Sequence, residues 1–138
     1  MERRDFLIKG CVLCFGGGML TSLLESCTSM PIYKAESHNR KLSIPIDKFG
    51  EDNFLIVRTP ELNYDIAVIR NRESEYRSFV MVCTHADNQV NFNGKEFSCS
   101  LHGSLFNSHG EVLRGPAERS LVSLVTHKEE NFIIIKLI

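Results

Sequence analysis

Two cysteines and two histidines are spaced along this chain in a way that could hold a metal centre. Cys83 and His85 form a C-x-H pair, and Cys99 and His102 form a C-x-x-H pair further along. Two thiolates and two imidazoles are enough for one centre with four protein ligands. Structural zinc sites use the same Cys2His2 set, so a zinc-stabilised binding module without redox activity is one hypothesis for this pattern.

The residues between the two ligand pairs predict the element that brings the pairs together. The segment 89–98 is typical of a β-hairpin, because Val90 and Phe92 alternate with polar residues and Asn93-Gly94 stands at the turn. Asn-Gly is a strong hairpin signal because both central positions of such a turn need a positive φ. A hairpin here folds back on itself, so we expect the C-x-H pair at its start to lie beside the C-x-x-H pair at its end.

The ligand pattern resembles that of the Rieske family of iron–sulfur proteins. In that family two cysteines hold one iron of a [2Fe–2S] cluster and two histidines hold the other. The resemblance implies one [2Fe–2S] cluster as cofactor, with Cys83 and Cys99 on the inner iron and His85 and His102 on the outer iron near solvent. The segments that carry the resemblance are Cys83-Thr84-His85, Cys99-Ser100-Leu101-His102-Gly103-Ser104 and, as the proline loop over the cluster, Gly115-Pro116-Ala117.

Four further positions can be compared with the family, and they bear on the redox properties that the resemblance implies. Ser104 matches a serine whose hydroxyl donates to a bridging sulfide, which favours the reduced state. Phe106 stands where high-potential members have a tyrosine that hydrogen-bonds a cysteine sulfur. A phenyl ring has no donor, so the resemblance implies that this hydrogen bond to the sulfur is missing here. Asn88 and Leu101 stand where subunits of cytochrome bc complexes have two cysteines joined by a disulfide. We therefore expect loops without that disulfide, and a midpoint potential below the upper end of the family's range of about −150 to +300 mV.

From Lys41 to the last residue, the sequence pattern is typical of β-strands. Leu42, Ile44 and Ile46 alternate, and short apolar runs predict strands at 54–57, 65–69, 78–82, 121–126 and 132–137. No segment after residue 40 has a helical period. The pattern predicts an all-β fold, and the resemblance implies a Rieske-type antiparallel β-sandwich or barrel with a small cluster-binding subdomain. The other histidines fall in predicted turns or polar segments and receive no ligand role: His38, His109 and His127.

The amino-terminal residues predict export and attachment to a membrane. Residues 1–26 have the features of an export signal, and Arg3-Arg4-x-Phe6-Leu7-x-Lys9 resembles the twin-arginine signal. The uncharged stretch 10–24 would form a helix of about 22 Å, shorter than the hydrocarbon core of about 30 Å. Cys27 follows a segment that resembles a bacterial lipobox, although Glu25 departs from the usual small or apolar residue. We expect an acyl anchor on Cys27, a tether over 27–40 and the Rieske domain over 41–138.

Composition and motifs favour electron transfer over other functions. The net charge of −1, without a run of basic residues, argues against a nucleic-acid partner. The sequence has no nucleotide fingerprint, mononuclear iron motif or nucleophile–base pair, which favours an electron carrier or oxidoreductase subunit over a stand-alone enzyme. The resemblance implies one-electron transfer at the outer face of a bacterial membrane, in the periplasm or cell envelope, with a redox protein as partner. The alternative is an iron–sulfur subunit of a larger membrane-associated oxidoreductase, either quinol-oxidising or a molybdenum enzyme.

Overall fold

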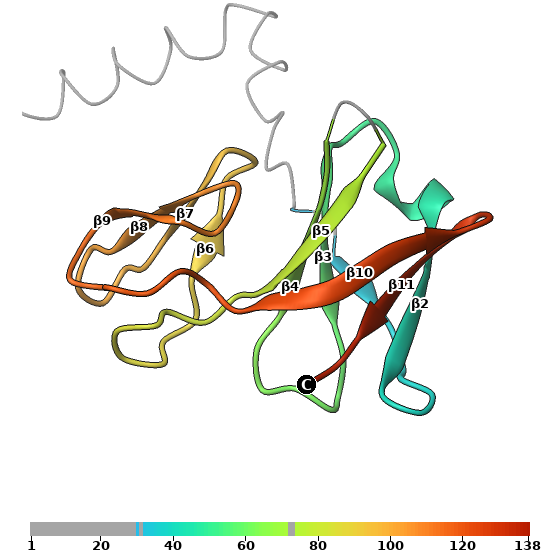
Figure 1. Ribbon diagram of the computed structural model, residues 1–138, viewed down its shortest axis with the longest axis horizontal. Helices are drawn as coiled ribbons and strands as arrows, with labels where there is room; N and C mark the ends of the chain where they lie inside the picture. The colour runs from blue at the N-terminus through green and yellow to red at the C-terminus, as the bar shows by residue number, and fades with distance from the viewer. Residues whose placement is uncertain (1–29, 31, 72–73) are drawn as a thin grey trace, which may run out of the picture.

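Two β-sheets make up the part of the chain described by the structure, a computed structural model that covers residues 30, 32–71 and 74–138 (Figure 1). The larger sheet has seven strands in the order β1-β3-β4-β5-β10-β11-β2. Its strands are β1 (Ile32–Lys34), β2 (Lys41–Pro45), β3 (Phe54–Arg58), β4 (Ile66–Arg70), β5 (Tyr76–Val80), β10 (Ser123–Glu129) and β11 (Phe132–Lys136). The smaller sheet contains β6 (Asn91–Phe92), β7 (Glu96–Ser98), β8 (Leu105–Asn107) and β9 (Val112–Arg114), in that order.

The all-β prediction is confirmed. The smaller sheet stands beside the larger one, on the left in Figure 1, and the chain enters it after β5 and returns to the larger sheet at β10. Among the described residues the one helix is η1 (Ile46–Phe49), a short 3-10 helix. No helix in this part of the chain is long and apolar enough to cross a membrane. The predicted export signal over 1–26 and Cys27 lie outside the described residues.

Strands β3 and β4 are buried on both faces, which explains why their sequences are continuous apolar runs. On β3, Leu55 and Val57 face a core that the larger sheet encloses, whereas Ile56 faces a second core toward the smaller sheet. On β4, Val68 and Ala67 divide between the two cores in the same way. Successive side chains of a strand point to opposite faces, so one sheet contributes to both cores.

The chain joins the larger sheet earlier than the sequence indicates. β1 pairs in parallel with β3, and Ala35, just after β1, is buried. Ser37 donates to Glu61 Oε1 from its backbone N–H at 3.1 Å and from its hydroxyl at 2.8 Å. Hydrogen bonds from Thr59 and from Ser37 lower the pKa of the Glu61 carboxyl to about 2. Residues 32–40 of the expected tether therefore pack on the domain that was expected to begin at residue 41.

Two elements near the ends of strands also differ from expectation. Ile46 is expected to continue the alternation of the preceding strand, but it begins η1, which follows Pro45 and buries Phe49. β10 begins and ends later than the expected strand 121–126, and Glu130, with a φ of +50°, completes a tight turn to β11. His127 therefore lies in β10 and not in a turn.

The predicted hairpin between the ligand pairs is present, but its turn differs from the expected one. β6 and β7 pair antiparallel, and Gly94 has a φ of +89°. Asn93 is not among the described residues with positive φ. Its side-chain oxygen instead accepts the backbone N–H groups of Lys95 and Glu96, each at 2.9 Å. Asn93 thus stabilises the turn through its side chain, a common role of asparagine in turns.

The second core joins the two sheets and contains both candidate cysteines. The Phe97 ring lies 4.3 Å from the Phe92 ring and 5.9 Å from the Phe79 ring, measured between centroids. Phe106 pairs with Phe97 across β8 and β7 and is fully buried. Cys83 and Cys99 pack in the same core as these aromatic rings.

Substitution of Gly110 by alanine is expected to destabilise this second core. Gly110 has a φ of +77°, and an added Cβ would lie 2.7 Å from Cε1 of the buried Phe79 ring. The backbone conformation costs about 1–2 kcal/mol and overpacking about 1–3 kcal/mol. We expect the urea midpoint of Gly110→Ala to fall accordingly. Gly50→Ala is the matched control, because Gly50 has a φ of +53° with nothing within 4 Å of the added Cβ. Equal losses in the two variants would contradict the steric argument.

Candidate metal centre

Two short loops present the four predicted ligands. The first ligand loop (residues 83–88) follows β5 and is closed by a bridge between Val82 and Gln89. The second ligand loop (residues 99–104) connects β7 to β8 and is closed by the pair Ser98 and Leu105. Each loop therefore begins at a cysteine and is closed across the residue pair that flanks it.

The first ligand loop is held by two backbone hydrogen bonds to Cys83. The Cys83 carbonyl accepts the N–H of Asp87 at 2.9 Å, and the Cys83 N–H donates to the carbonyl of Asn88 at 2.8 Å. Asp87 has a φ of +48°, a conformation that aspartate adopts more readily than most residues. The loop therefore closes tightly around its cysteine.

The second ligand loop repeats this pattern. The Cys99 carbonyl accepts the N–H of Gly103 at 3.0 Å, and the Cys99 N–H donates to the carbonyl of Ser104 at 2.9 Å. Gly103, at the position equivalent to Asp87, has a φ of +78°. The repeat makes Ser104 the structural equivalent of Asn88, the two residues standing at the same place relative to their cysteines.

The cysteines are buried and the histidines are exposed. Cys83 and Cys99 are 1% and 2% exposed, whereas His85 and His102 both lie at the surface. The two Nδ1 atoms of the histidines are 3.2 Å apart, and their ring centroids are separated by 4.9 Å. The hairpin has therefore brought the two ligand pairs together as expected, with the imidazoles facing one another at the surface.

The surroundings of Cys99 favour its thiolate form. Burial raises the pKa of the thiol, since a charged sulfur loses its hydration. Backbone hydrogen bonds from Leu101 and His102, and side-chain hydrogen bonds with Cys83 and Asn88, lower the pKa by more than burial raises it. The net result is a pKa below the ordinary value, and the thiolate is the form that binds metals.

The arrangement of the four candidate ligands matches the mixed ligation of a [2Fe–2S] cluster. Among residues 30, 32–71 and 74–138, no three His, Cys, Asp or Glu side chains are placed to hold a single metal ion. A Cys2His2 zinc site needs four donors around one ion. A [2Fe–2S] cluster with mixed ligation instead takes a pair of sulfurs on one iron and a pair of nitrogens on the other. A buried sulfur pair and an exposed nitrogen pair match that requirement.

Ser104 is placed to donate a hydrogen bond into the site. It is fully buried, and its Oγ accepts the N–H of Ala117 at 3.0 Å. No acceptor for its O–H is found in the described part of the chain. Buried hydroxyls ordinarily have an acceptor, and a cluster sulfide between the two loops would supply one. The geometry of Ser104 therefore fits the cluster that the ligand set indicates.

A third segment, the proline loop (residues 114–119), contacts both ligand loops. Arg119 accepts a hydrogen bond at its carbonyl from Thr84 Oγ1 at 2.5 Å. Arg114 Nε donates to the carbonyl of Gly103 at 3.1 Å, and Ala117 bonds the second loop through Ser104 as described above. The proline loop therefore lies against the site, where its resemblance to the covering loop of the Rieske family places it.

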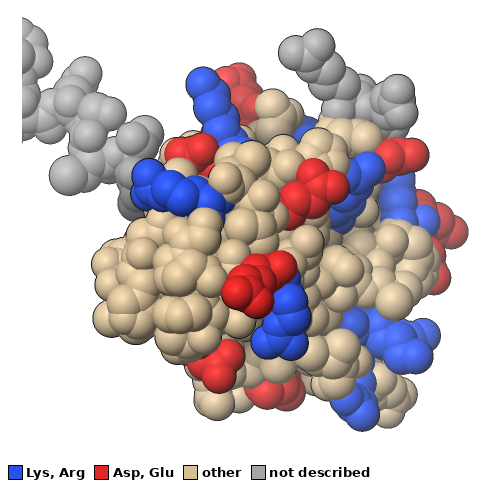
Figure 2. Space-filling view, turned by 60° about the vertical axis from the view of Figure 1, so that its left-hand side comes forward, with Lys and Arg blue, Asp and Glu red and all other residues tan. Residues whose placement is uncertain are grey.

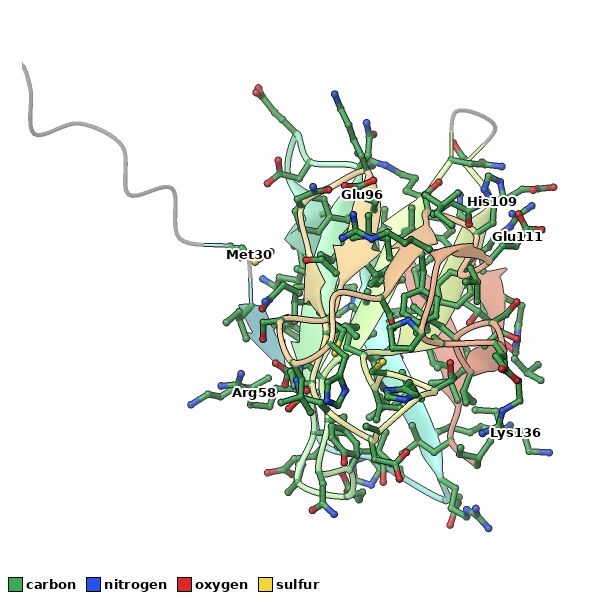
Figure 3. The ribbon with its side chains drawn as sticks, turned by 90° about the vertical axis from the view of Figure 1, so that its left-hand side faces the viewer. Met30, Arg58, Glu96, His109, Glu111 and Lys136 are labelled. Atoms are coloured by element: carbon green, nitrogen blue, oxygen red, sulfur yellow. The ribbon has the colours of Figure 1, made fainter. Side chains whose placement is uncertain are left out.

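The other histidines lie apart from the ligand pairs. His109 is exposed in the turn after β8, and its backbone N–H donates to Asn107 Oδ1 at 2.9 Å. Figure 3 shows His109 at the upper edge of the molecule, near Glu111. His127 on β10 has its Nε2 2.9 Å from Glu129 Oε1.

Asn88 contacts the site in a way that the sequence did not predict. Its Nδ2 lies 3.9 Å from Cys99 Sγ and 3.1 Å from the carbonyl oxygen of Gln89. The sequence marked Asn88 only as a position where a disulfide is missing. A signal was available, because Asn88 follows Cys83 at the same interval at which Ser104 follows Cys99.

A comparison with protein families and curated proteins agrees with this geometry. The family model of the Rieske [2Fe-2S] domain matches residues 44–127, more than half of the chain. Cytochrome b6-f complex iron-sulfur subunit 1 of Nostoc sp. is 45% identical over 88 residues, which are 62% of this chain and 42% of that protein. The chloroplastic subunit 1 of Nicotiana tabacum is 52% identical over 42 residues, 29% of this chain and 18% of that protein. The chain thus spans less than half the length of these relatives.

Solved structures share the fold. The cyanobacterial plasma membrane Rieske protein PetC3 from Synechocystis PCC 6803 superposes with a TM-score of 0.57 and 29% identity, over 67% of this chain and 94% of that one. A chain from the complex of reduced oxygenase and oxidized ferredoxin in carbazole 1,9a-dioxygenase gives a TM-score of 0.55 at 17% identity, over 72% and 94% of the two chains. At that identity the second likeness concerns the fold alone.

Proposed function

Because this chain belongs to the Rieske [2Fe–2S] family, whose cofactor is one [2Fe–2S] cluster, we propose that it transfers single electrons through a cluster held by Cys83, Cys99, His85 and His102. The observation that carries the proposal is a site with two exposed imidazoles, whose Nδ1 atoms are 3.2 Å apart, and two buried cysteines. When bound, the cluster accepts and releases one electron.

Each group in this site has a distinct role in the proposal. Cys83 and Cys99, both buried, would hold one iron and keep it away from water. His85 and His102, both exposed, would hold the other iron at the surface, where a partner can approach closely. Neutral imidazoles also leave less negative charge on the site than four thiolates would, so reduction is easier. The proline loop excludes water from the side that it covers.

The surface around the histidines supports a redox protein or a quinol-oxidising complex as the partner. Figure 2 brings the side of the smaller sheet forward and shows a broad area there without charged side chains. Close to His85, however, the exposed residues Glu118 and Arg119 line a hollow together with it. Leu101 and Leu113, on the second ligand loop and β9, are 55% and 57% exposed. Exposed apolar side chains of this kind mark surfaces at which a partner protein docks.

One comparison favours the alternative hypothesis, that the chain is a subunit of a larger oxidoreductase. The relatives from Nostoc sp. and Nicotiana tabacum are subunits of the cytochrome b6-f complex. An iron–sulfur subunit of a larger membrane-associated oxidoreductase, quinol-oxidising or a molybdenum enzyme, is therefore the second candidate. Purification in mild detergent separates the two, since a subunit should co-elute with a larger protein and a carrier should elute alone.

The location belongs to the same proposal. A twin-arginine-type signal over 1–26 would export the folded protein with its cluster, and a lipid on Cys27 would hold it at the outer face of a bacterial membrane. Mass spectrometry of the protein from its native membrane would test this. A mature chain that begins at an acylated Cys27 supports the anchor, and an unmodified Cys27 overturns it.

Low-temperature electron paramagnetic resonance of the dithionite-reduced protein tests the function, with iron and zinc quantified on the same sample. We expect a rhombic signal with a low average g value and two irons per chain, as mixed cysteine and histidine ligation requires. A silent sample that holds one zinc per chain would overturn the proposal and favour the zinc-stabilised binding module.

Substitution of Phe106 by tyrosine is expected to raise the midpoint potential. Phe106 is fully buried in the core that holds both cysteines, and the resemblance to high-potential family members implies that a phenol at this position donates to a cysteine sulfur. A preference of about 1 kcal/mol for the reduced state corresponds to roughly 40 mV for one electron. A redox titration measures the shift. Phe92→Tyr, which also buries a new hydroxyl, serves as the control and should lower stability without raising the potential; no rise in Phe106→Tyr would refute this account of the tuning.

A further inference from the structure

We propose that Asn88 is a positioning residue of this site, whose side-chain amide donates a hydrogen bond to the Cys99 sulfur, ties the two ligand loops together and favours the reduced state. The inference rests on the proposed role of Cys99 as a ligand. It assigns a function to a side chain that the ligand pattern itself does not include.

Asn88 contacts both cysteines. Its backbone carbonyl accepts the N–H of Cys83 at 2.8 Å, and its Nδ2 lies 3.9 Å from Cys99 Sγ. The same Nδ2 lies 3.1 Å from the carbonyl of Gln89. An amide nitrogen carries two hydrogens, so one can bond Gln89 while the other points to the sulfur. The Gln89 bond thus orients the half-buried amide toward Cys99.

The position of Asn88 repeats that of Ser104. The backbone carbonyl of each residue accepts the N–H of the cysteine in its own loop. Both then carry a side-chain donor at the inner side of the loop. Within the described residues, Asn88 is the one non-ligand side chain whose hydrogen bond joins one ligand loop directly to the other. The backbone donors to Cys99, from Leu101 and His102, come from its own loop.

A donor at a ligand sulfur has a defined redox effect. The sulfur carries more negative charge after reduction, so a hydrogen bond to it stabilises the reduced state more than the oxidised state. Removing the donor should therefore lower the midpoint potential. Placing a negative carboxylate at the same position should lower it further, because the added electron then meets a like charge.

Three variants of the full chain with its cluster test the inference by redox titration. Asn88→Leu keeps the approximate size and removes the donor, and we expect the ratio of reduced to oxidised protein at a fixed potential to fall about threefold, or about 28 mV at 59 mV per tenfold change. Asn88→Asp should give a larger fall. Asn91→Asp is the matched control, because Asn91 is exposed on β6 and a charge there is screened by solvent. An unchanged potential in Asn88→Leu would overturn the inference.

If the variants fail to take up the cluster, a measurement on the unmutated protein tests the role of Asn88. Protein labelled with nitrogen-15 only in asparagine side-chain amides should show a nitrogen-15 hyperfine coupling in pulsed paramagnetic resonance of the reduced state. Absence of the coupling overturns the role of Asn88. Failure of the proposed function is distinguishable, since the unlabelled protein would then give no mixed-ligand signal at all.

Discussion

Replacement of His102 by alanine is expected to abolish the resonance signal of the reduced cluster while the fold persists. The imidazole of His102 is exposed and faces His85 at 3.2 Å between the Nδ1 atoms. Its removal leaves one imidazole where two are needed, so the outer iron loses a ligand. Because the side chain is at the surface, its truncation creates no internal cavity, and the far-ultraviolet circular dichroism of the variant should match that of the parent.

The control for this variant is His109→Ala. His109 is also exposed, but it lies in the turn after β8, at the edge of the molecule shown in Figure 3. We expect full iron content and an unchanged signal in that variant. If His102→Ala kept the rhombic signal with full iron content, or if His109→Ala lost it, the ligand assignment would be wrong.

Substitution of Ser104 by alanine is expected to lower the midpoint potential and the stability together. The Ser104 hydroxyl accepts the N–H of the buried Ala117 at 3.0 Å and has its own hydrogen available for the cluster. A hydrogen bond to a charged group contributes about 1.5–3 kcal/mol. If about 1.4 kcal/mol of this favours the reduced state, the potential falls by roughly 60 mV. The orphaned N–H of Ala117 costs a further 1–3 kcal/mol, roughly, in the free energy of unfolding.

The two effects of Ser104→Ala can be measured separately. A redox titration reports the hydrogen bond toward the cluster, and urea denaturation reports the loss of the contact with Ala117. Ser100→Ala is the control, because Ser100 lies in the same ligand loop but is exposed. A stability loss with an unchanged potential would mean that Ser104 acts only by holding the proline loop.

The hairpin and the approach of the two Cys/His pairs were predictable because their signals are local. The spacing of Cys83, His85, Cys99 and His102 and the Asn-Gly turn all lie within one short stretch of the chain. The hairpin forms from neighbouring residues, and it brings the start and the end of the stretch close together. The outcome needed no knowledge of the rest of the fold.

Other features depend on contacts between distant residues, which the sequence does not encode in a local pattern. β1 has three residues within a polar segment, and it forms because Ile32 meets Ile56 on a strand much further along the chain. A strand of three residues is too short to produce a recognisable alternation of apolar and polar residues in the sequence. The early entry of the chain into the sheet was therefore missed.

The role of Asn88 could be predicted only in part: the interval that it shares with Ser104 marks its place in the loop, but its contact depends on side-chain geometry. In the sequence, Asn88 is one of several polar residues after His85. Only the folded loops show that its amide reaches the sulfur of the other loop. The turn at Asn93 gives the same lesson on a smaller scale: the hairpin was predictable, but whether asparagine serves by its backbone or its side chain was not.

Strands β3 and β4 contribute alternate side chains to both cores, so we expect neither core to unfold without the other. Ile56 and Ala67 belong to the core around the cysteines, and their neighbours on β3 and β4, such as Leu55 and Val68, belong to the core enclosed by the larger sheet. Separation of the smaller sheet would expose one face of those strands to water and so weaken the packing of the other core as well. Unfolding around the cysteines and unfolding of the scaffold are thereby coupled, so we expect the two cores to unfold as one cooperative unit.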